Sequence, residues 1–150
     1  MKAVIQRVKR GSVKIEDNPV GNIGKGYVIL LGVKEGDTEE NARYLANKTV
    51  NLRVFADDKD RMNLSIEQVN GEILVISQFT LYANTQKGNR PSFVGAAATE
   101  TANALYEEYV AALRRELGDK RVQTGKFGAM MEVEIINEGP VTIELTTDQS

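Results

Sequence analysis

The chain has 150 residues, 41% of them hydrophobic, which predicts one compact domain over residues 1–150 with a sizeable core. It contains no Cys and no His, which excludes disulfides, thiol chemistry, an imidazole base and the usual zinc ligands. The formal net charge is −2, so a globally basic nucleic-acid surface is absent, although a local basic rim stays open. We expect no cofactor and no metal, the alternative being a magnesium or calcium site built from carboxylates alone.

The sequence has no apolar run of about 18 residues, so we expect no transmembrane helix and no membrane partner. The segment from Met1 to Arg7 begins like a basic signal peptide, but its apolar stretch is short and Arg7, Lys9 and Arg10 interrupt it. We therefore expect no signal peptide and a cytoplasmic protein.

Much of the chain has the residue patterns of β-strands. Ala3 to Val8 and Ser12 to Glu16 flank Arg10-Gly11, which predicts a hairpin with its turn there. Tyr27 to Val33 is a continuous apolar run, typical of a strand buried on both faces, and Glu72 to Phe79 is expected to be a second buried strand. Further short or alternating strands are expected at Leu52 to Phe55, Met131 to Ile135 and Val141 to Leu145.

Two helices complete the predicted elements. The first starts at Asp37 or Thr38, either of which can cap it, and has apolar residues at helical spacing. The second runs from about Thr99 to Leu117, where Gly118 suits its C-terminal end. The predicted fold class is α+β, with two main helices covering a strongly curved, barrel-like, mainly antiparallel sheet.

The first candidate site is Ser77-Gln78-Phe79-Thr80, where hydroxyl, amide and aromatic side chains follow a buried strand. A backbone that turns at a strand end can aim successive N–H groups at one spot, which stabilises a developing oxyanion. From these residues alone, an ordinary strand end is the favoured interpretation.

Two loops are further candidates. The segment Lys87-Gly88-Asn89-Arg90-Pro91-Ser92-Phe93 combines cations with an aromatic ring, which suits a phosphate and a base, although solvated surface loops often look the same. Asn137-Glu138-Gly139-Pro140 lies between the last two expected strands, and the residues alone predict a tight hairpin turn there.

The ordered set of these segments resembles the bacterial and eukaryotic D-aminoacyl-tRNA deacylase family from end to end. Two residues depart from the family pattern: Tyr82 stands where a smaller residue is usual, and Met130 where a polar one often occurs. The matching segments are Ile5-Gln6-Arg7-Val8, Leu31-Gly32-Val33, Met62-Asn63-Leu64, Ser77-Gln78-Phe79-Thr80-Leu81, Arg90-Pro91-Ser92-Phe93, Thr124-Gly125 with Phe127, and Asn137-Glu138-Gly139-Pro140-Val141-Thr142.

The resemblance implies a homodimer that binds the aminoacylated 3′ end of tRNA, with no DNA partner. It implies that Gly139 and Pro140 form a cis-proline motif that enters the partner's active site and excludes L-amino acids, with Arg7 and Asn137 supporting the motif. Such a stiff backbone rejects the wrong enantiomer by steric clash. The residues expected near the substrate are Met131, Lys87, Arg90, Pro91, Ser92 and Phe93.

The resemblance also places Ser77, Gln78, Phe79 and Thr80 around the ester that is cleaved. Backbone N–H groups near Phe79 and Thr80 would hold the oxyanion, and Gln78 would position the substrate. Thr80 has no base to activate it as a nucleophile. We therefore expect the free hydroxyl of the terminal ribose to activate or orient water, and we expect glycine on the wrong tRNA to be a further substrate.

Three alternatives remain open at this stage. One is the sister type of editing deacylase, whose Gly-Pro bond is trans and which removes L-alanine from mischarged tRNA. Another is a non-catalytic tRNA-binding module, which the missing catalytic base would explain. The last is a purely structural dimer, which would leave the Lys87 to Phe93 loop without a role.

Overall fold

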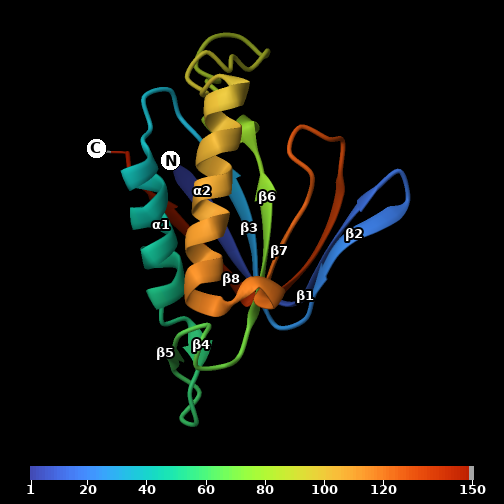
Figure 1. The fold of residues 1–150 in the computed structure, drawn as a ribbon, viewed down its shortest axis with the longest axis vertical. Coiled ribbons are helices and arrows are strands. Elements are labelled where there is room, and N and C mark those ends of the chain that lie inside the picture. The colour runs from blue at the N-terminus through green and yellow to red at the C-terminus, as the bar shows by residue number, and fades with distance from the viewer. Residues whose placement is uncertain (149–150) are drawn as a thin grey trace.

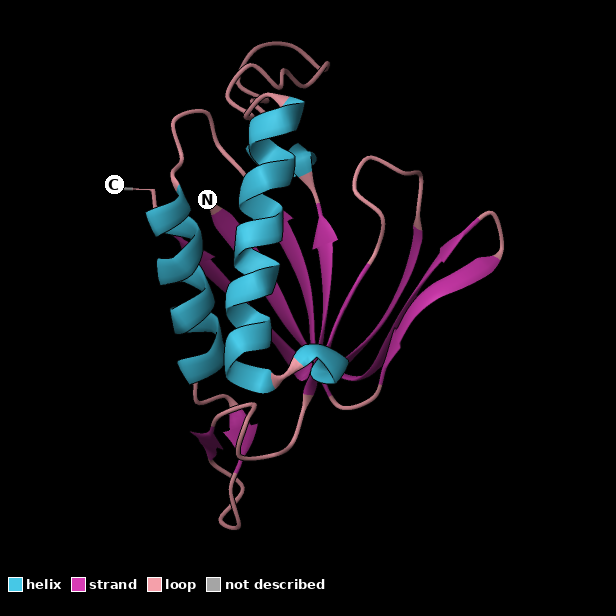
Figure 2. Cartoon of the chain, in the orientation of Figure 1, coloured by secondary structure: helices cyan, strands magenta, loops and turns pink. Residues whose placement is uncertain are grey.

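The structure is a computed structural model that describes residues 1–148, and it shows a curved sheet with two helices against one face (Figures 1 and 2). The strands are β1 (Lys2–Ile15), β2 (Asn18–Ile23), β3 (Gly26–Gly32), β4 (Phe55–Ala56), β5 (Met62–Leu64), β6 (Glu72–Ser77), β7 (Val122–Thr124) and β8 (Glu132–Thr146). The helices are α1 (Glu39–Asn51) and α2 (Thr99–Leu117), with 3₁₀ turns η1 (Phe79–Tyr82) and η2 (Asp119–Arg121).

The main sheet is mixed and nearly closes into a barrel. Its strand order is β2-β1-β3-β6-β7, and β8 pairs with β1. Strand β1 is antiparallel to all three of its neighbours, whereas β3–β6 and β6–β7 are parallel pairs. Parallel neighbours need a long crossover connection, which is usually a helix. Here α1 connects β3 to β6, and α2 connects β6 to β7. The predicted α+β class is confirmed, with a parallel centre in the mainly antiparallel sheet.

The hairpin predicted around Arg10-Gly11 is wrong, because β1 continues through these residues as one strand. Gly11 lies directly over the side chain of Val28, where a Cβ atom would clash, so its glycine serves close packing rather than a turn. The turn lies farther on, at Glu16 and Asp17, whose φ angles are 50° and 66°. Positive φ at both central residues is the geometry of a tight hairpin turn, and it pairs β1 with β2.

The hairpin turn predicted at Asn137 to Pro140 is also wrong. These residues lie within β8, which pairs with β1 along both of its halves, and the register shifts on either side of Val8. The side chain of Asn137 takes up the irregularity, because its Oδ1 accepts from the Val141 N–H at 2.8 Å and its Nδ2 donates to Gln6 at 2.8 Å. The segment is therefore a bulge in a long strand, and its Gly139-Pro140 peptide bond is cis.

Both predicted helices are confirmed. Thr38 caps α1, and its hydroxyl accepts from the Asn41 N–H at 3.3 Å. The two helices lie side by side on the sheet, and a buried hydrogen bond of 2.8 Å joins the hydroxyls of Thr49 and Tyr109 between them (Figure 1). Tyr106 ties α2 to the sheet by donating to the Val75 carbonyl at 2.9 Å. Burial raises the pKa of the Tyr106 phenol, so this group stays a donor.

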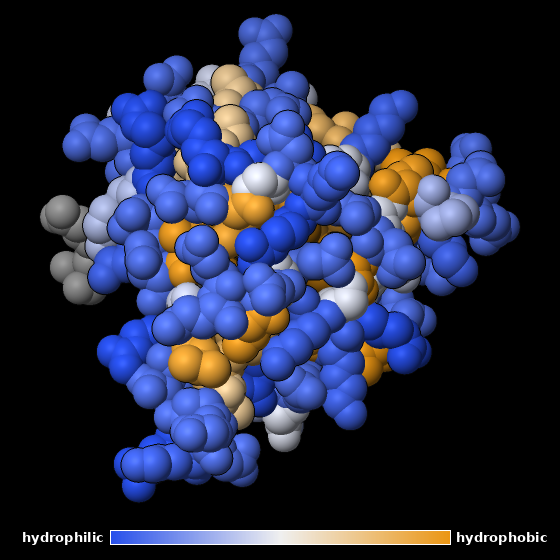
Figure 3. Space-filling view, turned by 60° about the horizontal axis from the view of Figure 1, so that its bottom comes forward, coloured by the Kyte–Doolittle hydropathy of each residue, from blue (hydrophilic) through white to orange (hydrophobic). Residues whose placement is uncertain are grey.

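Apolar side chains fill the space between the helices and the sheet. A second, smaller cluster lies where β1, β3 and β6 face β8. On the face that Figure 3 turns forward, hydrophilic residues cover most of the surface, with small apolar patches between them. Within residues 1–148, no helix is both long and apolar enough to cross a membrane. The large apolar side chains that do lie exposed include Phe79, Val94 and Met130.

Candidate active site

A cavity of about 630 Å³ opens beside the C-terminal end of β6. One wall is the strand end and the turn that follows it, from Ile76 to Phe79. The start of α2 and the loop before it form a second wall, and the loop from Phe127 to Met131 forms a third. Elements that are far apart in the sequence therefore meet at one edge of the sheet, which is the usual location of a ligand site in a sheet with parallel strands.

The turn after β6 is fixed to its neighbouring strand by the backbone. The Gln78 N–H donates to the Leu31 carbonyl at 2.8 Å, which extends the β3–β6 pairing by one residue. Gly32 lies under the turn, where a Cβ atom would be 3.2 Å from the Gln78 carbonyl oxygen. The absence of a side chain at Gly32 therefore lets η1 approach β3 closely.

Among the described residues, two backbone N–H groups of the turn have no hydrogen-bond acceptor. The hydrogen bonds of η1 begin with the Leu81 N–H, which donates to the Gln78 carbonyl at 3.3 Å. The preceding N–H groups, those of Phe79 and Thr80, have no acceptor within a 3₁₀ turn that starts there. Both groups are thus available to a substrate oxygen.

The side chain of Thr80 is bound to Gln78, whose Nε2 donates to the threonine hydroxyl oxygen. An amide donor draws electron density from the oxygen that accepts from it. Among residues 1–148, the cavity is lined without any Asp, Glu, Lys, Arg or Tyr side chain. Thr80 itself is exposed and is not among the residues that line the cavity. In the described part of the chain, its hydroxyl has no hydrogen bond to an ionisable side chain that could remove its proton.

Phe93 brings the second candidate segment to the cavity. Its ring meets the Phe79 ring edge-on, with the centroids 5.0 Å apart, and both rings line the cavity. Two backbone hydrogen bonds between Asn84 and Ser92, of 2.7 and 2.9 Å, close the base of the loop that directly precedes Phe93. Beyond this base the expected substrate-binding residues Lys87, Arg90 and Pro91 are exposed and do not line the cavity.

The remaining predicted residues divide between the cavity and the opposite end of the strands. Met131 lines the cavity, and Gly125 lies close under its sulfur atom, where a Cβ would be 2.5 Å from Sδ. Gly139 and Pro140 do not line it. They lie beside Arg7, whose Nε donates to the Glu138 carbonyl at 3.2 Å. One chain therefore does not bring its own Gly139-Pro140 segment to its Ser77 to Thr80 segment.

Sequence reasoning missed the small residues of the cavity wall. Ala96, Ala97 and Thr99 line it just before and at the start of α2, and Gly128 and Ala129 line it from the third wall. The sequence did contain one indication of this wall, the run of alanines from 96 to 98 directly before a helix. Small residues at the start of a helix leave room for a ligand. Within residues 1–148, no group of three or more Asp and Glu side chains is placed to hold a metal ion.

Comparison with known proteins gives consistent results. The family described as "D-Tyr-tRNA(Tyr) deacylase" matches residues 4–146. A protein of Clostridium botulinum (strain Alaska E43 / Type E3) named "D-aminoacyl-tRNA deacylase" is 51% identical over 150 residues, covering 100% of this chain and 99% of its own. A protein of the same name from Desulfatibacillum aliphaticivorans is 54% identical over 143 residues, covering 95% and 97%. A solved structure named "c-Myc DNA Unwinding Element Binding Protein" is 41% identical with a TM-score of 0.94, covering 99% and 100%.

Proposed function

This chain belongs to the D-Tyr-tRNA(Tyr) deacylase family, and from that membership we propose that it hydrolyses the ester between a D-amino acid and the 3′ end of tRNA. The observation that carries the proposal is the uncharged cavity at the end of β6, bordered by a turn whose Phe79 and Thr80 N–H groups have no acceptor among residues 1–148; Phe79 lines the cavity and Thr80 is the next residue. An ester needs a carbonyl acceptor site and water, and both fit such a cavity. We expect the enzyme to work in the cytoplasm, on aminoacyl-tRNA made for protein synthesis.

The reaction proceeds by addition of water to the ester carbonyl. The N–H groups of Phe79 and Thr80 donate to the oxygen that becomes negative, and Gln78 and Ser77 border the reacting carbon. The bond between the carbonyl carbon and the ribose oxygen then breaks. The ribose oxygen takes up a proton, so the products are a free amino acid and a tRNA with a free 3′ hydroxyl.

Thr80 does not serve as the nucleophile in this mechanism. Its hydroxyl oxygen accepts from Gln78, and no ionisable side chain among the described residues lines the cavity. The group that activates or orients water is then the free hydroxyl of the terminal ribose. Thr80 instead holds the Gln78 amide in place.

Chiral selection comes from a second copy of the chain. Gly139 and Pro140 lie in β8 and do not line the cavity of their own subunit, which supports the proposal that they enter the cavity of a partner in a homodimer. Their backbone carbonyls leave space for a hydrogen or a D side chain and clash with an L side chain. Arg7 and Asn137 hold this segment through the hydrogen bonds described above. Glycine passes the same filter, which makes mischarged glycyl-tRNA a substrate.

Basic residues outside the cavity bind the tRNA backbone. Lys87 and Arg90 lie on the exposed loop that Phe93 joins to the cavity, and Pro91 and Ser92 shape its return. Phosphate contacts of this kind position a nucleic acid without reading its sequence. The rim is local, which agrees with the net charge of −2.

The test is the rate of deacylation of one tRNA charged with a D-amino acid, its L enantiomer or glycine. We expect fast release of the D-amino acid and glycine, and at least a hundredfold slower release of the L-amino acid, which is a difference of about 2.7 kcal/mol in activation free energy. Fast release of L-alanine would instead identify the sister type of deacylase. Binding of tRNA without any turnover would identify a non-catalytic module.

A further inference from the structure

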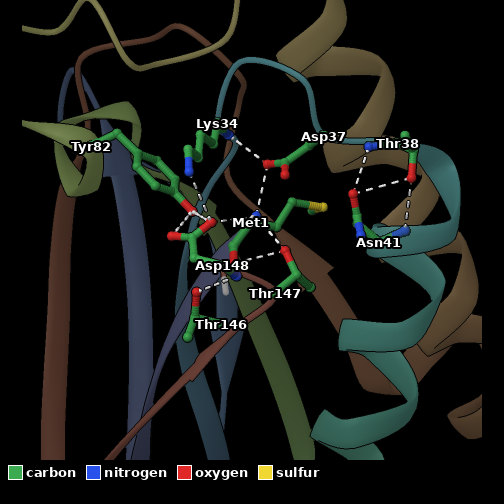
Figure 4. Close-up of polar contacts among 9 residues, drawn as sticks. All are labelled: Met1, Lys34, Asp37, Thr38, Asn41, Tyr82, Thr146, Thr147 and Asp148. Atoms are coloured by element: carbon green, nitrogen blue, oxygen red, sulfur yellow. Dashed lines mark hydrogen bonds and ion pairs between the residues drawn. The ribbon is translucent and has the colours of Figure 1, made fainter. Parts of the chain in front are cut away.

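The amino group of Met1 is enclosed in a polar cluster on the side of the sheet that carries η1 (Figure 4). Met1 has no exposed surface, and its ammonium lies 2.8 Å from a carboxylate oxygen of Asp37 and 2.7 Å from the hydroxyl of Thr147. A carboxylate oxygen of Asp148 is 3.8 Å away. Two acidic side chains therefore share one buried ammonium.

Asp37 and Asp148 link this ammonium to separate parts of the fold. Asp37 also accepts from the Lys34 N–H at 2.6 Å, which fixes the segment between β3 and α1. Asp148 approaches the Lys34 ammonium at 3.8 Å and follows the end of β8. The Met1 carbonyl accepts from the Thr147 N–H at 2.9 Å, so the first and last parts of the sheet meet at the cluster.

Tyr82 connects the same cluster to the candidate catalytic turn. Tyr82 is the last residue of η1, and its hydroxyl donates to the Asp148 carboxylate at 3.2 Å. Its ring lies against Gly32 on one side, while the Lys2 ammonium is 5.2 Å from the ring centroid. Burial and the nearby charge of Asp148 raise the pKa of this phenol, so it remains a donor.

We propose that the Met1 ammonium, Asp148 and Tyr82 form a positioning relay that holds η1 in its catalytic geometry. This inference rests on the proposed function, because it gives the relay the task of orienting the Phe79 and Thr80 N–H groups. The relay is short: Tyr82 and Phe79 are the two ends of one 3₁₀ turn of four residues. The Ala83 N–H donates to the Thr80 carbonyl at 3.2 Å, so a shift at Tyr82 is passed directly to Thr80.

The charge of the amine matters because its surroundings are enclosed. The side chain of Asp37 is 9% exposed, and a carboxylate that loses a buried counter-charge is costly to keep ionised. An acetyl group on the Met1 amine removes that charge and adds volume where there is no exposed surface. It therefore disturbs Asp148, and through it the hydroxyl of Tyr82.

The test compares Tyr82→Phe with the wild-type protein. The control is Tyr44→Phe, which removes the same hydroxyl oxygen from a side chain that is 53% exposed. Losing one hydrogen bond from the relay lowers kcat for D-aminoacyl-tRNA about three- to tenfold with little change in KM. Hydrogen exchange of the Leu81 and Ala83 amides becomes faster by a similar factor in Tyr82→Phe and stays unchanged in Tyr44→Phe. Unchanged exchange in Tyr82→Phe overturns the relay, whatever the protein's activity.

A second comparison tests the amine itself. Protein that carries one acetyl group, located on the Met1 amine by mass spectrometry, is expected to show the same faster exchange at Leu81 and Ala83. Normal exchange and normal kcat in the acetylated protein would remove Met1 from the relay. Hydrogen exchange is measured without substrate, so this result does not depend on deacylase activity. A protein without turnover would contradict the proposed function, and the exchange result would still decide whether the relay exists.

Discussion

Arg7 donates from Nε to the carbonyl oxygen of Glu138 at 3.2 Å, and so joins residues that are 131 positions apart. Its Nη1 donates to the Val54 carbonyl at 2.6 Å. The same guanidinium closes over Gly139, where a Cβ atom would be 3.1 Å from Nη2. One planar group with several fixed donors therefore links the β8 bulge to the segment after α1.

Arg7→Lys tests whether this link supports chiral selection. A lysine ammonium is a single point and cannot span both carbonyls, so we expect the free energy of unfolding to fall by about 1–3 kcal/mol. We also expect the ratio of D to L deacylation rates to fall about tenfold, since the Gly139 backbone can then move and admit an L side chain. Arg10→Lys is the matched control, because the Arg10 side chain is 64% exposed. An unchanged rate ratio in Arg7→Lys would show that the motif is held by other contacts.

The role of the RNA can be separated from that of Thr80. A tRNA whose terminal ribose lacks the free hydroxyl is expected to be deacylated at least a hundredfold more slowly, because general acid–base assistance contributes about that much. Thr80→Val removes only the hydroxyl oxygen that accepts from Gln78, and we expect a loss of about tenfold or less. The measurement is the single-turnover rate at saturating enzyme. If instead the altered ribose reacts normally and Thr80→Val abolishes turnover with binding intact, threonine is the nucleophile.

The helices and the buried strands were predictable because their signals are local. Thr38 supplies a cap, and Thr99 to Leu117 keeps one apolar face until Gly118, whose φ of 90° ends the helix. The two wrong hairpins have one cause. Gly11 and Gly139 look like turn residues, yet each serves a close approach within a long strand, to Val28 and to Arg7 respectively. Such contacts join residues far apart in the sequence, and no local pattern reports them.

In the candidate site, too, some residues carried a signal in the sequence and others did not. Ser77 to Phe79 were a candidate because polar residues follow an apolar strand, yet the residues alone favoured an ordinary strand end, and only the family resemblance pointed to a site. The structure places these three residues on the cavity. The small residues opposite them carry no chemical group that would attract notice, although they create the space. The position of Tyr82 near the Met1 amine depends on the meeting of both ends of the chain, so it was accessible only from the structure.

Phe93 gives a test of substrate binding that leaves the reacting groups in place. Stacking of a base on an aromatic ring contributes about 1–3 kcal/mol, so we expect Phe93→Ala to raise KM for D-aminoacyl-tRNA about tenfold or more. We expect kcat to fall less, because Phe79 and Thr80 keep their backbone donors. Val94→Ala is the control, since Val94 follows Phe93 in the sequence and its own side chain is 82% exposed. An effect of Phe93→Ala confined to kcat would place the ring at the reacting ester and not at the terminal base.

Gly32→Ala tests the geometry of the catalytic turn from below. The added Cβ atom would lie 3.1 Å from the Leu81 Cβ and 3.2 Å from the Gln78 carbonyl oxygen, so η1 must move outward by a few tenths of an ångström. We expect kcat to fall about tenfold and the free energy of unfolding to fall by about 1–3 kcal/mol, since small displacements of catalytic donors and overpacking both have effects of this size.

The matched control for this change is Gly95→Ala, because a Cβ atom at Gly95 meets nothing within 4 Å. Gly95 also belongs to the loop before α2, so the control keeps the added methyl group near the same end of the sheet. We expect it to keep normal kcat and stability. If Gly32→Ala loses stability but keeps full kcat, the Phe79 and Thr80 N–H groups tolerate displacement, and their assignment as oxyanion donors fails. A loss of kcat together with a displacement of η1 supports the assignment, because Phe79 and Thr80 belong to η1.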